Sequence, residues 1–165
     1  ELSKLLSESY ENIEIEISSN KIIFYIDQLI LISKLIDGNF PDYTRVIPKN
    51  NTNDLMINRE NLLSAVDRVS TIANEKSPSI KFKLLENLIN LSAVNNENST
   101  ATEDIQASYD GNEIEIGFNS RYVMDILDNL EGKEIKISFN DNSNPIMIHE
   151  NIDSENIYVL MPMRV

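Results

Sequence analysis

Ile13-Glu-Ile-Glu-Ile17 and Ile135-Lys-Ile-Ser-Phe139 are two stretches in which apolar and polar residues alternate strictly. Successive side chains of a β-strand point to opposite faces of a sheet, so this alternation predicts two half-buried strands. Further apolar runs follow each stretch, and each copy closes on an apolar residue before proline, at Phe40-Pro41 and at Met161-Pro162. The matching order and spacing predict tandem copies of one structural unit.

The rest of the chain is also dominated by strand patterns, which turn-forming residues separate. The further predicted strands are Lys21–Tyr25, Leu29–Leu35, Ile80–Leu84, Leu88–Val94, Asp104–Tyr109, Ile114–Ile116, Ile146–His149 and Ile157–Met161. A period near 3.6 predicts two helices, Asn58–Ala73 and Ser120–Leu130, the second with Ser120 as its N-cap. Their predicted buried faces are Leu62, Leu63, Val66, Val69 and Ala73 in the first, and Val123, Ile126, Leu127 and Leu130 in the second. Leu2, Leu5 and Leu6 indicate the end of a third helix. The predicted fold class is therefore α+β.

The two copies of the repeat differ in what precedes them. The second copy follows a segment, residues 45–119, with its own helix and strands, and the first copy has no such segment. We therefore expect residues 1–43 to be the truncated C-terminal half of one domain and residues 44–165 to be a complete domain of ordinary size.

The composition limits the functions that the chain can have. Its net charge is −13, so its surface repels phosphate, which argues against a tight grip on nucleic acid but not against enclosing it. Cysteine is absent, which excludes a disulfide framework and a thiolate metal site. No apolar run reaches membrane-spanning length, and the first residues have no signal-peptide character, so we expect a cytoplasmic protein without a membrane partner.

Motifs for catalysis are missing. The four glycines form no phosphate-binding loop, and no serine lies in a nucleophile-elbow context. The single histidine, His149, ends a strand pattern, and the carboxylates Asp125 and Asp128 have no third ligand in the sequence pattern. We predict no catalytic, cofactor-binding or metal-binding residues, and no enzyme activity.

The chain closes on Tyr158-Val-Leu-Met-Pro-Met-Arg-Val165, which is almost wholly apolar to its last residue. Pro162 has no backbone N–H and ends any regular central strand. Two interpretations stay open for this tail: a flexible methionine surface for several partners, or a last strand that completes a core.

Four motifs carry a resemblance to a known family: Lys34–Pro48, Ile72–Glu75, Glu115–Asp125 and Tyr158–Arg164. Together they closely resemble the bacterial β sliding clamp, the non-catalytic processivity subunit of DNA polymerase III. The resemblance implies three copies of one domain per protomer and a head-to-tail homodimer that closes a ring around duplex DNA. Two helices per domain would face the interior and antiparallel sheets would lie outside. It also implies a cytoplasmic, nucleoid-associated protein without cofactors. Its partners would be the polymerase III catalytic subunit, the clamp loader, and other polymerases and repair proteins that dock through short linear motifs.

The resemblance also implies three sets of site residues. The partner-peptide pocket would comprise Pro41, Arg45, Val46, Asn119, Tyr122, Val159, Met161, Pro162, Met163 and Arg164. The DNA-facing residues would be Arg59, Arg68 and Arg121. The dimer interface would include Thr71 and Ile72, with Ile80–Leu84 as the pairing edge strand that brings Ile80 and Phe82 to the interface.

Two other classes of function compete with this one. A β-rich adaptor domain that binds apolar peptides, with no role on DNA, would account for the tail but not for four ordered motifs. A carboxylate-dependent hydrolase would need a histidine or carboxylate cluster that the sequence lacks.

Overall fold

The computed structural model describes residues 2–6, 12–74, 78–95, 97, 99–150 and 156–164. The chain divides into two compact units, Glu1–Pro41 and Asp42–Val165. The sequence placed the boundary two residues later, after residue 43. Each unit is described by itself.

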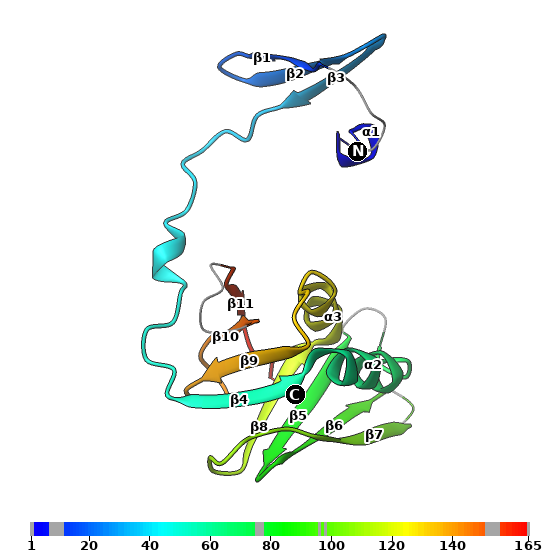
Figure 1. The fold of residues 1–165 in the computed structure, drawn as a ribbon, viewed down its shortest axis with the longest axis vertical. Helices are drawn as coiled ribbons and strands as arrows, with labels where there is room; N and C mark the ends of the chain where they lie inside the picture. Colours follow the sequence, from blue (N-terminus) through cyan, green and yellow to red (C-terminus); the bar gives the residue numbers. More distant parts are fainter. Residues whose placement is uncertain are drawn as a thin grey trace. The chain divides into compact units, whose positions relative to one another are not determined.

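The first unit contains a short helix and a three-stranded antiparallel sheet (Figure 1). These elements are α1 (Leu2–Leu5), β1 (Glu14–Ile17), β2 (Lys21–Ile26) and β3 (Leu29–Lys34), and the strand order is β1-β2-β3. The prediction of a half-buried first strand is wrong for this unit, since Ile15 and Ile17 are 52% and 68% exposed. Ile15 lies opposite Phe24 and Ile17 opposite Ile22. The alternating residues of β1 therefore place these apolar side chains on one face of the sheet, and no described residue of the unit covers Ile15 and Ile17 on that face.

The second unit contains two four-stranded antiparallel sheets, in the orders β11-β10-β9-β4 and β7-β6-β5-β8 (Figure 1). Its elements are the 3₁₀ turn Tyr43–Arg45, β4 (Asn53–Asn58), α2 (Arg59–Ser70), β5 (Ser79–Leu85), β6 (Leu88–Val94), β7 (Thr100–Gln106), β8 (Ile114–Asn119), α3 (Ser120–Asp128), β9 (Glu134–Phe139), β10 (Ile146–His149) and β11 (Tyr158–Leu160). Two isolated bridges, Met56 with Ser108 and Gly117 with Met163, join one sheet to the other.

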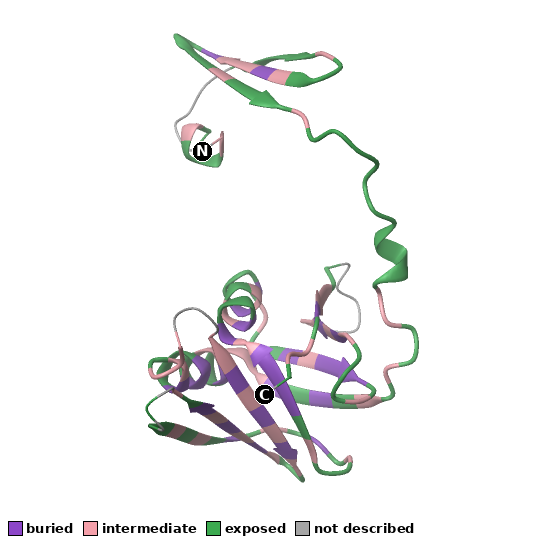
Figure 2. Cartoon of the chain, turned by 180° about the vertical axis from the view of Figure 1, so that it is seen from behind, coloured by how far each residue is buried: buried purple, intermediate pink, exposed green. Residues whose placement is uncertain are grey.

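One hydrophobic core fills the second unit. Figure 2 shows buried and partly buried residues alternating along the strands, as the period of two requires. The largest fully buried side chains in this core include Leu55, Leu62, Leu91, Leu127 and Phe139, drawn from both sheets and both helices. Full burial of one such side chain contributes about 1.5–3 kcal/mol, so this continuous core is the main source of the unit's stability.

Both helices of the second unit begin directly after a strand. Asn58 ends β4 and caps α2, accepting a hydrogen bond from the Asn61 N–H at 3.0 Å. Asn119 ends β8 and caps α3, accepting one from the Arg121 N–H at 3.0 Å. The predicted N-cap Ser120 is instead the first helical residue and is buried, because asparagine already supplies the cap one position earlier.

Other predicted elements need smaller corrections. The strand β4 was not predicted; only Leu55 and Ile57 of its residues are buried, between residues of low strand propensity. The strand β7 spans Thr100–Gln106 rather than Asp104–Tyr109. The helix α2 ends at Ser70, before Ala73. Of the predicted buried residues, Leu63, Ala73 and Ile126 are only partly buried, whereas Ala65 of α2, which was not predicted, is fully buried.

Candidate functional site

The C-terminal tail crosses from one sheet to the other. Leu160 is buried in the core, and Met161 directly after it is 60% exposed. The Met163 N–H then donates to the Gly117 carbonyl at 2.8 Å, which ties the tail to β8. The interpretation as a last strand that completes a core therefore applies to β11, while Met161 is exposed and Pro162 and Met163 are partly buried. A partner surface on these three residues stays a prediction.

Two hollows lie beside this tail. The first, named here the apolar hollow, has a volume of about 370 Å³ and is lined by Arg45, Val46, Ile47, Pro48, Lys49, Asn50, Asn51, Asn140, Asn144, Pro145, Val159 and Met161. The second, named here the polar hollow, has a volume of about 590 Å³ and is lined by Glu115, Gly117, Asn142, Ser143, Pro162, Met163 and Arg164. Apolar side chains with amide groups around them suit the first hollow to short peptide segments.

The loop Asn140–Pro145, named here the rim loop, contributes residues to both hollows. The Asp141 carboxylate holds it in shape by accepting bonds from the Ser143 N–H at 2.8 Å and the Asn144 N–H at 2.9 Å. The side chains of the same two residues donate to it as well, at 2.9 Å and 2.6 Å. The backbone bonds, then the side-chain bonds, lower the pKa of Asp141 to about 2. The rim is thus pre-formed by one carboxylate.

The segment on the other side of the apolar hollow is also fixed by side chains. The Asn51 amide donates to the carbonyls of Ser138 at 2.8 Å and Pro145 at 3.2 Å. Upstream, the Asp42 carboxylate accepts from the Thr44 hydroxyl at 2.6 Å and pairs with Arg45 Nε at 3.2 Å. The Thr44 hydroxyl bond is the main cause that lowers the pKa of Asp42.

The structure brings together only part of the predicted pocket. Arg45, Val46, Val159 and Met161 line the apolar hollow, and Pro162, Met163 and Arg164 line the polar hollow. Asn119 caps α3, Tyr122 is 58% exposed, and Pro41 belongs to the first unit; none of the three lines either hollow within the described residues. The sequence predicted a turn at Asn140–Asn144 but assigned neither the rim loop nor Lys49–Asn51 to the pocket. Asn50-Asn51 and the asparagine-rich stretch at 140–144 are both turn signals, which could have drawn attention to them.

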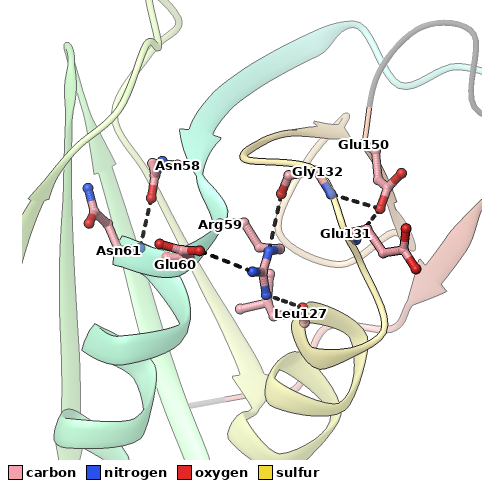
Figure 3. A network of polar contacts seen from close by, with 8 residues as sticks. All are labelled: Asn58, Arg59, Glu60, Asn61, Leu127, Glu131, Gly132 and Glu150. Atoms are coloured by element: carbon pink, nitrogen blue, oxygen red, sulfur yellow. Dashed lines mark hydrogen bonds and ion pairs between the residues drawn. The ribbon is translucent and has the colours of Figure 1, made fainter.

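Arg59 is a correction to the predicted DNA-facing set. Its guanidinium donates to the Gly132 carbonyl at 3.1 Å and the Leu127 carbonyl at 3.0 Å, and its side chain is only 17% exposed (Figure 3). The loop after α3 is held from its other side by the Glu150 carboxylate, which accepts from the N–H groups of Glu131 and Gly132. These backbone bonds, with Glu131 first, lower the pKa of Glu150. The Arg59 guanidinium therefore binds backbone carbonyls at and after the end of α3, instead of facing solvent as a DNA contact would require.

The other two arginines lie at the surface. Arg68, on α2, binds Glu103 of β7 through two nitrogens, with Nε at 3.0 Å from the carboxylate. This bidentate bond is the main cause that raises the pKa of Arg68 and lowers the pKa of Glu103. Arg121 is exposed in the first turn of α3.

The predicted interface strand is a second correction. The strand β5, which carries Ile80 and Phe82, pairs with β6 on one side and β8 on the other, so it is not an edge. Ile80 is fully buried and Phe82 is 4% exposed, packed edge-to-face on Phe118 with ring centroids 5.2 Å apart. Among the described residues of the second unit, the edge strands are β4, β7, β8 and β11. β4 and β8 each make one further isolated bridge, to Ser108 and Met163, whereas β7 pairs with β6 alone over seven residues. Thr71 is exposed at the end of α2, and Ile72 packs partly against the core.

His149 is the last residue of β10 and lies directly opposite Lys136 of β9. Burial first, and the Lys136 charge second, lower the pKa of its imidazole. No group of three or more His, Cys, Asp or Glu side chains that could hold a metal ion is found in the described part of the chain. Within that part, no helix is long and apolar enough to cross a membrane.

Two four-stranded antiparallel sheets that share a core with two adjoining helices make the second unit a domain of the DNA-clamp class. The family model for the C-terminal domain of the DNA polymerase III beta subunit matches residues 44–164, and the model for its central domain matches residues 1–42. The chain therefore belongs to the family of the DNA polymerase III beta subunit, the bacterial β sliding clamps.

Individual relatives agree with this assignment. The beta sliding clamp of Caulobacter vibrioides is 38% identical over all of this chain and 44% of the relative, and that of Escherichia coli is 34% identical over all of this chain and 45% of the relative. The crystal structure of the Bartonella birtlesii sliding clamp bound to griselimycin superposes with a TM-score of 0.87 at 42% identity, over 99% of this chain and 44% of that one. The chain thus spans less than half the length of these relatives.

Proposed function

We propose that this chain is part of a ring-shaped processivity factor that encircles duplex DNA and docks replication and repair proteins through short peptides. The apolar hollow beside the C-terminal tail is the observation that carries the docking role. Family membership supports the ring, because the curated relatives carry the name beta sliding clamp. An adaptor without a DNA role would leave the clamp homology unexplained.

The ring itself is proposed as a head-to-tail homodimer of three-domain protomers. Residues 1–43 would belong to the second domain and residues 44–165 would form the third. The edge strand β7 is a better candidate for pairing with another protomer than β5. Thr71 and Ile72 follow α2, the helix whose Arg68 binds Glu103 of β7. An exposed strand edge offers unpaired N–H and C=O groups to a second chain.

The contact with DNA is proposed to be weak. Arg68 and Arg121 remain the DNA-facing candidates on α2 and α3, while the net charge of −13 opposes a tight grip. A closed ring holds DNA by topology, so the protein itself would act without catalysis and without a cofactor. Its proposed partners are the polymerase III catalytic subunit, the clamp loader, and other polymerases and repair proteins, in the cytoplasm and at the nucleoid.

The docking role is tested by titrating a fluorescently labelled peptide Gln-Leu-Ser-Leu-Phe with this chain and two variants. Met161→Ala removes an exposed apolar side chain from the hollow, and Met56→Ala removes a 37% exposed methionine on β4 as the matched control. We expect saturable binding that weakens about tenfold for Met161→Ala alone, since a methionine side chain contributes about 1.5 kcal/mol or more when covered. Equal binding by all three proteins would contradict the proposed site.

A further inference from the structure

The apolar hollow carries an unusual charge for this chain. The sequence has 27 acidic and 14 basic residues, so an average surface pocket should contain more carboxylates than cations. Among the described residues that line the apolar hollow, the charged ones are nevertheless Arg45 and Lys49. The other described lining residues are apolar or carry a neutral amide.

Three described carboxylates lie within three residues of this lining in the sequence, and all are engaged. Asp54 pairs with Lys136 at 2.8 Å and accepts a hydrogen bond from the Ser138 hydroxyl at 2.7 Å. Asp42 accepts from the Thr44 hydroxyl and pairs with Arg45 through Nε, and the Arg45 side chain stays 83% exposed. Asp141 uses both of its oxygens on Ser143 and Asn144 of the rim loop. Lys49 is exposed and makes no hydrogen bond or ion pair with any described residue. Two cationic groups therefore face solvent at one wall of the hollow.

We propose that the occupant of the apolar hollow is a peptide segment whose apolar anchor is flanked by aspartate or glutamate, with these carboxylates lying over Arg45 and Lys49. The inference rests on the proposed docking function and specifies the partner of that site. An acidic peptide is repelled by most of a surface with net charge −13, so attraction confined to one wall fixes where and in which direction it docks.

The test compares three kinds of labelled peptide on this chain: Gln-Leu-Ser-Leu-Phe with two aspartates, two asparagines or two lysines added. Each kind is made twice, once with the addition at the N-terminus and once at the C-terminus. Binding is measured at about 50 mM and about 500 mM salt. Lys49→Glu reverses one charge at the wall of the hollow. Lys133→Glu, the matched control, makes the same change at an exposed position directly before β9, at the end of that strand away from the rim loop. Since each surface charge pair changes affinity about threefold, we expect the aspartate peptide to bind about threefold to tenfold more tightly than the asparagine peptide at low salt.

The possible results distinguish a failure of the proposed charge preference from a failure of the proposed docking function. A preference for aspartate that is lost in Lys49→Glu, kept in Lys133→Glu and reduced at high salt supports the inference. Equal binding of all three peptides, or an equal effect of the two lysine variants, overturns the charge preference and leaves the docking function standing. Absence of saturable binding by every peptide overturns both. Tighter binding of the lysine peptide contradicts the inference directly.

Discussion

At the scale of single residues, side chains that bind backbone groups decide the shape of the site. Asp141 shapes the rim loop, Asn51 fixes the opposite wall, and Arg59 joins the start of α2 to the end of α3. None of the three bonds was predicted, because a sequence pattern gives the type of a side chain but not the carbonyl or amide it will reach. Arg59 shows the consequence: arginine is a residue type that favours DNA contact, but this side chain binds two carbonyls and the Glu60 carboxylate (Figure 3).

Arg59→Ala is expected to destabilise the second unit by about 2–3 kcal/mol, since it removes charge-assisted bonds and leaves two partly buried carbonyls unpaired. Urea denaturation followed by circular dichroism measures the change. Arg45→Ala is the matched control, because that side chain is 83% exposed in a surface ion pair and its loss is expected to change stability by less than about 1 kcal/mol. Equal stability of the two variants would contradict the role given to Arg59.

Asp141 makes stability depend on pH in a defined window. Its pKa is lowered from 3.8 to about 2 in the folded protein, so the folded state binds fewer protons than the unfolded state. The stabilisation is present above pH 4 and is lost as the pH falls from about 4 through about 2. We expect Asp141→Asn to reduce this part of the acid-induced loss, measured as urea midpoints from pH 2 to 5. Asp128→Asn, at an exposed position on α3, is expected to leave it intact; an unchanged profile in Asp141→Asn would be inconsistent with the rim-loop geometry.

At the scale of elements, the sequence predicted most strands and both long helices because their apolar periods match the buried faces. It failed where an element has few apolar residues, as in β4, and where the position of a strand in its sheet matters, as in β5. The alternating burial of β5 is visible in the sequence, but strand order depends on contacts between distant segments. The same limit explains why the predicted docking site lacked the rim loop: the tail and the segment around Arg45 are local motifs, whereas the rim loop reaches them only through the fold.

Phe82→Ala tests the interior position of β5. A large side chain that is 4% exposed and packed on Phe118 should cost about 3–5 kcal/mol of unfolding free energy when truncated, because it leaves a cavity. Thermal or urea unfolding measures this loss. Thr71→Ala, at an exposed position, is expected to change stability by less than about 1 kcal/mol. A small effect of Phe82→Ala, similar to that of Thr71→Ala, would favour the original assignment of this residue to an exposed interface.

At the scale of the whole molecule, charge and topology have separate roles in the proposed clamp. The net charge of −13 keeps the protein from adhering to phosphate, and a closed ring would supply the retention that charge does not. The chain spans 44% of the Caulobacter vibrioides relative. We therefore expect it to bind a linear duplex of about 20 base pairs more weakly than about 10⁻⁴ M at physiological salt, measured by fluorescence anisotropy. Micromolar binding that falls steeply with salt would show that an electrostatic grip, rather than enclosure, is available to this chain.

The most direct test of the docking site is to map a bound Gln-Leu-Ser-Leu-Phe peptide by NMR, using ¹⁵N-labelled chain. The proposal predicts that the largest amide shifts fall on residues 45–51, on the rim loop and on Val159–Arg164, with little change on α2. Shifts concentrated on the exposed sheet β1–β3 instead, around Ile15 and Ile17, would contradict it and assign peptide binding to the first unit.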